Sequence, residues 1–378
     1  MAKMNDHREI RLSKSCIGPE EKAAVLQVLD REFLGMGAEV QKFEIELGTF
    51  FSRPVVCVNT GTAALHLALQ ALGIGPGDEV LVQSLTYVAT FQAIAATGAK
   101  PIACDIDQKT FCIDVTDAAT KLSKKTKVII PVHYAGGVGD IEKVYNFAQK
   151  NNIRVVEDAA HAFGSSYNKK KIGSFGDIVC FSFDGIKNVT SGEGGCVVTE
   201  DQDVLDKIRD ARLLGVENDT EKRFKGQRSW EFDVTHQGWR YHMSNLMAAI
   251  GIEQLAKFED AALARQSLAK RYLKNLSQCS KLSFLPLDYN EVVPHIFVVQ
   301  NLSSKLRSDI IHQLSLKKIQ SGVHYFPNHH LSFFKSSASE QLLKTDISYE
   351  KLITLPLHPD LSLEDVDYVS FHLLEILN

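Results

Sequence analysis

The 378-residue sequence contains no run of about 18 apolar residues, the shortest length typical of a helix that crosses a bilayer. No Gly-x-Gly-x-x-Gly follows the first expected strand, which excludes an open dinucleotide-binding dehydrogenase. The first residues, MAKMNDHREIRLSKS, lack the apolar segment of a secretory signal. We therefore expect neither a membrane span nor export of the chain.

The sequence also lacks blocks of charge of one sign. Its 42 Lys and Arg and 46 Asp and Glu residues are interspersed and give a formal net charge of −4. This balance excludes a nucleic-acid-binding surface and a polybasic membrane anchor. The seven cysteines are scattered, and no pair of them has the spacing of zinc ligands. They fit reduced core thiols, so we predict a cytoplasmic protein without a metal site.

Short apolar runs alternate with helical patterns between about residues 20 and 200. This alternation predicts an α/β fold with a mostly parallel sheet between helices, and ligands of such sheets bind beyond the carboxyl ends of the strands. A long amphipathic helix is expected over residues 244–268. Because the chain is too long for one ordinary core, we predict two domains. The large one, with an N-terminal arm, spans residues 1–255, and a smaller C-terminal α/β domain spans 256–378.

One lysine stands between a strand-like run and a glycine cluster in FSFDGIKNVTSGEGG, residues 181–195. Residues 178–183 are mostly apolar, as in a strand covered on both faces. Lys187 at the end of such a strand can lose part of its hydration, which lowers its pKa and makes it a usable nucleophile. The alternative is a loop lysine that extends into solvent.

Three other expected strand ends carry residues that packing alone does not require. The segment NTGTAAL places Gly61, Thr62 and Ala63 at a strand-to-helix turn, where an anion is favoured. Asp158 directly follows one apolar strand, and Tyr87 lies just past another. A purely structural interpretation would make the turn and Asp158 helix caps and Tyr87 a core residue.

A single ligand has a group for each of these residues. Pyridoxal 5′-phosphate carries a phosphate for the helix N-terminus and Ser182, and a ring nitrogen for Asp158. Its flat ring would stack on Tyr87, and its aldehyde would form a Schiff base with Lys187. The ordered set therefore predicts this cofactor.

These motifs resemble those of the DegT/StrS family of pyridoxal-phosphate sugar aminotransferases, which have the fold type I architecture of aspartate aminotransferase. The matching segments run along nearly the whole chain. They are GMGAEVQKFEIELGTFF, NTGTAALHLAL, LTYVATFQAI, GAKPIACDID, IIPVHYAGG, VVEDAAHAFGS, FSFDGIKNVTSGEGG, AAIGIEQL, SGVHYFP and LITLPLHPDLS. The resemblance implies a fold type I enzyme with a large cofactor-binding domain and a smaller C-terminal domain.

The resemblance also implies a role for each matching residue. Lys187 would form the Schiff base and Asp158 would pair with the ring nitrogen, so these two are the expected catalytic residues. His161 would lie beside the phenolic oxygen of the cofactor, and Glu193 would have a structural role. The other implied cofactor contacts are Gly61, Thr62, Ala63, Tyr87 and Ser182, and the implied substrate contacts are His324, Tyr325, His329 and His330.

The segment before the long helix departs from the family pattern. Family members usually have Gly-Tyr-Asn-Tyr-Arg, whose asparagine reaches the cofactor phosphate of the neighbouring subunit. This sequence has GWRYH, with Arg240 in the asparagine position and His242 in the arginine position. Arginine binds phosphate well, so we expect a homodimer with shared active sites in which Arg240 contacts the cofactor of the partner subunit. A surface salt bridge is the alternative.

The activity implied by the resemblance is that of a nucleotide-sugar aminotransferase, a transaminase of the EC 2.6.1 class. Glutamate would donate the amino group, leaving 2-oxoglutarate, and a keto-6-deoxy sugar carried on a nucleotide would accept it. The segment MSNLMAAIGIEQL resembles members that act at C4 more than those that act at C3. The product would enter deoxyamino sugar and polysaccharide or O-antigen biosynthesis. Two alternatives stay open: a pyridoxal-phosphate-dependent deoxysugar dehydratase and a non-catalytic regulator of the same fold.

Overall fold

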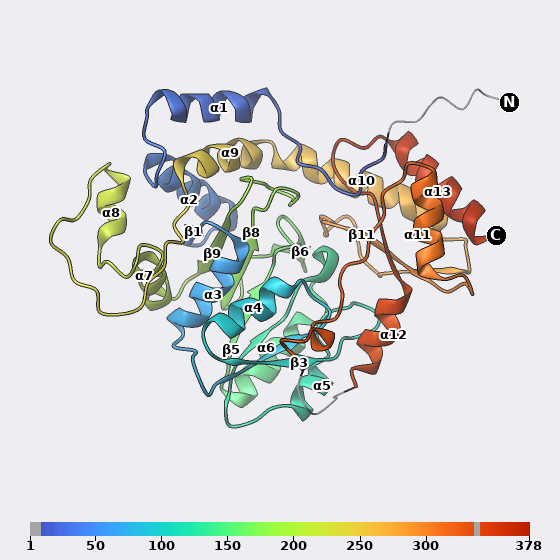
Figure 1. Ribbon diagram of the computed structural model, residues 1–378, viewed down its shortest axis with the longest axis horizontal. Coiled ribbons are helices and arrows are strands. Elements are labelled where there is room, and N and C mark those ends of the chain that lie inside the picture. The colour runs from blue at the N-terminus through green and yellow to red at the C-terminus, as the bar shows by residue number, and fades with distance from the viewer. Residues whose placement is uncertain (1–8, 336–340) are drawn as a thin grey trace.

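The computed structural model describes residues 9–335 and 341–378, and the first eight residues of the expected N-terminal arm lie outside the described residues (Figure 1). Its largest sheet has seven strands in the spatial order β1-β9-β8-β5-β4-β2-β3. The strands are β1 (Val55–Val58), β2 (Glu79–Gln83), β3 (Lys100–Cys104), β4 (Thr126–Ile130), β5 (Arg154–Asp158), β8 (Ile178–Ser182) and β9 (Gly195–Thr199).

The sheet is mostly parallel, as the sequence predicts. Strands β3, β2, β4, β5 and β8 run parallel to one another, whereas β9 is antiparallel to both β8 and β1. Strand β9 reverses because it follows β8 through a turn, without the crossover helix that a parallel connection needs. The carboxyl ends of β5 and β8 therefore lie side by side at one edge of the sheet.

Helices cover both faces of this sheet, and successive strand side chains alternate between the faces. The side chains of Val56 and Val58 lie on the face that is covered by α3 (Gly61–Ala71), α4 (Val88–Ala96) and α7 (Gln202–Ala211). Val55 and Cys57 belong to the opposite cluster, which includes α2 (Ala38–Phe51), α5 (Val115–Thr120), α6 (Ile141–Asn151) and α9 (Asn245–Ala256). Helix α1 (Pro19–Asp30) packs on α9. Burial on both faces explains why the strands are almost continuously apolar.

A buried ion pair joins three of these elements near the sheet edge. The Arg212 side chain, directly after α7, is fully buried, and its Nη1 donates to Glu44 Oε1 of α2 over 2.5 Å. The same nitrogen donates to the Cys57 carbonyl of β1 over 2.6 Å. Beyond this pair, α8 (Asp219–Phe224) lies at the periphery (Figure 1).

The prediction of one long helix over residues 244–268 is wrong, because the structure has two helices there. Helix α9 ends at Ala256 and α10 (Phe258–Leu276) begins after Lys257, whose φ of −105° and ψ of 13° are not helical. The two helices run end to end across the upper part of the molecule in Figure 1, with α1 above α9. Apolar spacing continues across the break, so periodicity alone could not detect it. The break lies close to the expected domain boundary at 255/256, which stays a prediction.

The C-terminal part has its own antiparallel sheet in the order β10-β11-β12, formed by β10 (Leu282–Phe284), β11 (Phe297–Asn301) and β12 (Leu352–Leu355). Helices α10, α11 (Arg307–Leu316) and α13 (Leu363–Leu377) share a core with it. Ile10 also belongs to this core and bridges to Ile319, so the start of the described chain packs on the C-terminal part.

The remaining elements are short: β6 (Ser166–Tyr167), β7 (Lys170–Lys171), η1 (Tyr134–Gly136), η2 (Asn328–His330) and α12 (Leu343–Lys351). None of the helices in the described parts of the chain combines the length and the apolar character that crossing a membrane requires.

Candidate active site

A cavity of ≈ 580 Å³ lies at the carboxyl ends of β5 and β8, next to the N-terminus of α3. Parallel strands of neighbouring crossovers end at the same edge, so residues that follow them in sequence meet there. Nine of the residues predicted from sequence line this cavity: Gly61, Thr62, Tyr87, Asp158, His161, Ser182, Lys187, His324 and Tyr325.

The N-terminus of α3 forms one wall and is suited to bind an anion. Thr60 caps the helix, and its Oγ1 accepts from the Ala63 N–H over 3.0 Å. The Ala63 N–H is therefore already used by the helix cap. Gly61 and Thr62 line the cavity, whereas Ala63 does not. A Cβ at Gly61 would lie 2.7 Å from Ser182 Cβ, so only glycine allows this close approach of α3 to β8. The helix dipole and the exposed amides favour a phosphate here.

Asp158 is the last residue of β5 and is 5% exposed. Its Oδ2 accepts from Thr90 Oγ1 over 2.7 Å, and its Oδ1 accepts from the Ala160 N–H over 3.2 Å. These bonds fix the carboxylate at the cavity wall, where a cationic ring nitrogen would compensate its charge. Thr90 lies one helical turn after Tyr87 in α4, and that spacing is the only signal in the sequence that could have pointed to it.

Lys187 lies in the turn after β8, where its N–H donates to the Asp184 carbonyl over 3.0 Å. Burial lowers the pKa of Lys187 to about 8, and the carboxylates of Asp184 and Asp158 act in the opposite direction. Arg265, buried nearby, further lowers that pKa. The uncharged amine, which is the nucleophilic form, is therefore far more populated near neutral pH than in an ordinary exposed lysine.

Two buried histidines, His161 and His295, and the partly buried His324 surround Lys187, and His295 is the one that the sequence analysis missed. Its Nε2 lies 3.3 Å from Lys187 Nζ, and its ring centroid lies 4.5 Å from that of His161. Burial, and then the charge of Lys187, holds the pKa of both His161 and His295 well below the usual value. The same two causes lower the pKa of His324 to about 4. All three imidazoles are therefore neutral at pH 7 and do not repel a charged lysine.

Tyr325 and Tyr87 complete the opening of the cavity. The Tyr325 hydroxyl lies 2.9 Å from His161 Nε2, and the rings of Tyr87 and Tyr325 lie 5.5 Å apart. Tyr87 is 58% exposed, so its ring is available to stack on a flat ligand. Glu193, expected to be structural, also lines the cavity.

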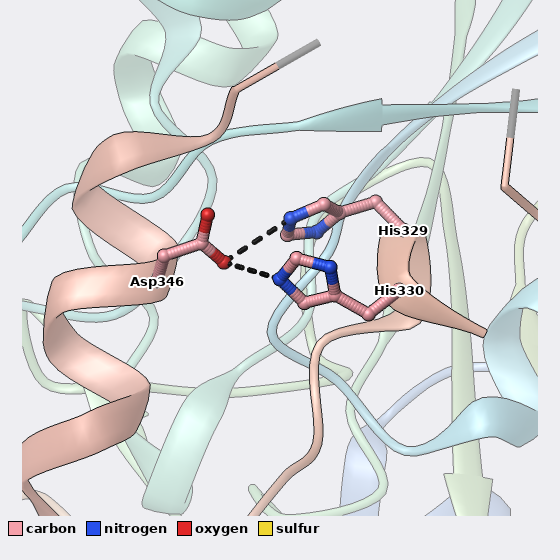
Figure 2. Close-up of side chains that lie close together, drawn as sticks. All are labelled: His329, His330 and Asp346. Carbon is pink, nitrogen blue, oxygen red and sulfur yellow. Dashed lines mark hydrogen bonds and ion pairs between the residues drawn. The ribbon is translucent and has the colours of Figure 1, made fainter. Parts of the chain in front are cut away.

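Three residues predicted to bind cofactor or substrate lie elsewhere. Arg240 is exposed and lines a separate hollow of ≈ 120 Å³ near Leu213 and Arg223. His329 and His330 do not line the cofactor cavity but face Asp346 of α12 instead (Figure 2). His324, by contrast, lines the cavity, and its Nδ1 lies 2.8 Å from Thr354 Oγ1.

An unpaired buried nitrogen in the cavity wall indicates that the residues present fit pyridoxal phosphate. Nδ1 of His161 is buried in the cavity wall and has no hydrogen-bond partner within the described residues. A buried unpaired nitrogen costs free energy unless a ligand satisfies it. The cavity also offers an anion-binding helix end, a buried carboxylate, an exposed aromatic face and a lysine of lowered pKa, as the groups of this cofactor require.

The comparison with known proteins agrees with this geometry. The model of the DegT/DnrJ/EryC1/StrS aminotransferase family matches residues 15–373. The spore coat polysaccharide biosynthesis protein SpsC of Bacillus subtilis is 36% identical over 365 residues, which cover 93% of each chain.

Two solved structures match nearly the whole length of this chain. Spr1654 from Streptococcus pneumoniae, assigned as a sugar aminotransferase and solved in its PMP form, has a TM-score of 0.90 and 31% identity. That match covers 97% of this chain and 98% of the other. PseC of Helicobacter pylori, an aminotransferase involved in pseudoaminic acid biosynthesis, has a TM-score of 0.90 and 27% identity, covering 98% and 99%.

This chain therefore belongs to the DegT/DnrJ/EryC1/StrS aminotransferase family. It is an enzyme with the fold of the sugar aminotransferases, and its cofactor is pyridoxal phosphate. The predicted family, fold class and cofactor are confirmed.

Proposed function

We propose that this enzyme transfers an amino group from glutamate to a keto-6-deoxy sugar carried on a nucleotide, at C4 rather than C3. The observation that carries the proposal is the convergence of Lys187, Asp158 and the N-terminus of α3 on one cavity, with the pKa of the lysine lowered to about 8. The similarity to SpsC, named for polysaccharide biosynthesis, supports a product that enters a surface polysaccharide.

We assign a separate role in the reaction to each of the main residues of the cavity. When bound, pyridoxal phosphate supplies an aldehyde that takes up an amino group and a ring that accepts electrons. Lys187 would hold this aldehyde through Nζ, and its uncharged amine would serve as the general base that moves a proton at the substrate carbon. Asp158 holds the proton of the ring nitrogen, and Thr90 fixes its carboxylate. Neutral His161 donates or accepts a hydrogen bond without adding charge.

The substrate side of the cavity is proposed to be formed by His324 and Tyr325. Both line the cavity and come from the C-terminal part of the chain, whereas Asp158 and Ser182 come from strands of the large sheet. Buried Cys57, Cys180 and Cys196 are free thiols, which suits work in a reducing compartment such as the cytoplasm.

The direct test is the absorbance of the purified protein before and after addition of glutamate, beside a Lys187→Ala variant. We expect the visible band of the lysine Schiff base to be replaced by the near-ultraviolet band of the aminated cofactor in the wild-type protein. A wild-type protein that stays colourless with added cofactor, or yellow and inert to every amino donor, would contradict the proposal.

The sugar acceptor is tested separately. Nucleotide-linked 4-keto-6-deoxy and 3-keto-6-deoxy sugars are added to the aminated enzyme, and return of the visible band identifies the acceptor. Product NMR then locates the amino group. Return of the band with the 3-keto sugars alone would contradict C4 amination and leave the aminotransferase itself intact.

We also propose a homodimer in which exposed Arg240 reaches the cofactor phosphate of the partner subunit. Mixing inactive Lys187→Ala subunits with Arg240→Ala subunits tests this arrangement, because each mixed dimer would contain one site with both native residues. Activity in the mixture above the sum of the two separate variants is the expected result. A monomer by sedimentation would contradict it.

A further inference from the structure

Two histidines and one aspartate converge between η2 and α12, outside the cofactor cavity (Figure 2). Nε2 of His329 lies 3.2 Å, and Nε2 of His330 lies 2.7 Å, from the same oxygen, Oδ1 of Asp346. The three ligand atoms all lie within 4.8 Å of one another. Residues 9–335 and 341–378 contain no second cluster of His, Cys, Asp and Glu that meets this criterion.

His329 is held in position from its other side. Its Nδ1 lies 2.7 Å from Ser84 Oγ, and its backbone N–H donates to the same oxygen over 3.1 Å. Its Nε2 is buried and makes no hydrogen bond of good geometry within the described residues, although Asp346 is near. In the tautomer with its proton on Nδ1, His329 donates to Ser84 Oγ and presents the lone pair of Nε2, as metal-ligating histidines do.

The distances suit a tetrahedral ion. Two ligand atoms that are each about 2.0–2.1 Å from zinc lie about 3.3 Å apart in tetrahedral geometry. The 3.2 Å between His329 Nε2 and Asp346 Oδ1 is already close to that value. The 2.7 Å to His330 must open slightly, and this is feasible because the His330 side chain is 43% exposed. The same exposure leaves room for a water as the fourth ligand.

The donor set also selects the class of metal. Two imidazoles and one carboxylate suit zinc and neighbouring transition metals, whereas Mg²⁺ and Ca²⁺ prefer oxygen ligands alone. The cysteine spacing gave no reason to expect a metal site, and this cluster contains no cysteine.

We propose that His329, His330 and Asp346 form a binding site for one divalent transition-metal ion, with Zn²⁺ as the best match. The ion links η2 to α12 and so holds in place residues 326–330, the segment that follows Tyr325. That segment also borders the cofactor cavity, because Asn328 Nδ2 donates to the carbonyls of Ser84 and Thr86, over 3.1 and 2.8 Å, and Thr86 lines the cavity. This role replaces the direct substrate contact expected for His329 and His330.

The test uses the full-length, tag-free and cofactor-loaded protein after removal of metals. Zn²⁺ alone is titrated in competition with a chromophoric chelator, and Co²⁺ alone is followed by its visible d–d absorption. We expect one ion per chain, with His330→Ala and Asp346→Asn each weakening Zn²⁺ binding at least tenfold. Excess Mg²⁺ is not expected to compete.

Matched controls come from α11, where His312 and Asp309 are exposed. His312→Ala and Asp309→Asn are expected to bind Zn²⁺ like the wild type. No stoichiometric binding by the wild type, or undiminished binding by both His330→Ala and Asp346→Asn, would overturn the proposal. Because a variant can fail for other reasons, X-ray absorption of the wild-type complex is a second measurement. A zinc spectrum with two imidazole ligands supports the site, and one without imidazole overturns it.

Discussion

Nζ of Lys187 lies 3.3 Å from Nε2 of His295, although the two residues are 108 positions apart in the sequence. Lys187 follows β8 of the large sheet, whereas His295 precedes β11 of the small one. Arg265 of α10 holds the segment of His295 in place, because its Nη1 donates to the His295 carbonyl over 3.2 Å. The segment that precedes β11 thus places a neutral imidazole beside the amine of the proposed catalytic lysine.

Replacement of His295 should slow the reactions of Lys187. Misplacement of a reacting group by about 1 Å can cost about 100-fold in rate, and His295→Phe removes the polar neighbour that orients the Lys187 amine. We therefore expect the rates of cofactor capture and of glutamate-driven conversion to fall about tenfold or more. Stopped-flow absorbance measures both rates. His312→Phe, at an exposed position in α11, is the control. Rates equal to the wild type would mean that His295 only fills space.

Gly61 should be intolerant of even one methyl group. Its Cβ in Gly61→Ala would lie 2.7 Å from Ser182 Cβ and 3.2 Å from Ser182 Cα, so α3 must move away from β8. We expect at least a tenfold loss of cofactor affinity, measured by titration of the cofactor-free protein. Gly35→Ala is the matched control, because nothing lies within 4 Å of the added Cβ. Unchanged affinity in Gly61→Ala would contradict a phosphate site between α3 and Ser182.

The pKa of Lys187 predicts the pH dependence of cofactor capture. Burial lowers that pKa to about 8, so in the cofactor-free protein the fraction of nucleophilic amine increases as the pH rises and reaches one half near pH 8. The capture rate should therefore rise with a midpoint near pH 8, instead of near the ordinary lysine value of about 10.4. Asp184→Asn should move the midpoint to lower pH, because the Asp184 carboxylate raises the pKa of Lys187. A midpoint near 10 in the wild type would contradict burial of the amine.

The ion pair of Arg212 and Glu44 should matter for folding. Arg212→Met leaves the largely buried Glu44 carboxylate without its cation, and such losses cost about 3–5 kcal/mol of unfolding free energy. Urea denaturation followed by circular dichroism measures this loss, and adding Glu44→Gln should restore part of it. Lys207→Met, which breaks an exposed pair with Asp203, should cost about 0–1 kcal/mol. A similar loss in both variants would show that burial of Arg212 is energetically unimportant.

Much of the site could be predicted from sequence because its residues follow strands. Asp158 ends β5, Ser182 ends β8, and Lys187 and Tyr87 lie in the turns after strands, so the parallel order alone brings them to one edge. The helix over residues 244–268 was predicted too long, because hydrophobic periodicity continues through Lys257 while its backbone does not. Ala63 was expected to bind phosphate, but the Thr60 cap uses its N–H, a detail that the motif does not encode.

The sequence by itself determined the alternation of strands and helices, the apolar sheet and the edge at which the cofactor residues gather. These features depend on local periodicity and on the direction of parallel strands, and both are properties of short segments. Only the tertiary structure decided that His295 meets Lys187, that Arg240 lines a separate hollow, and that His329 and His330 turn toward Asp346. Such contacts depend on how separate elements pack against one another, and no local pattern specifies the packing of their side chains.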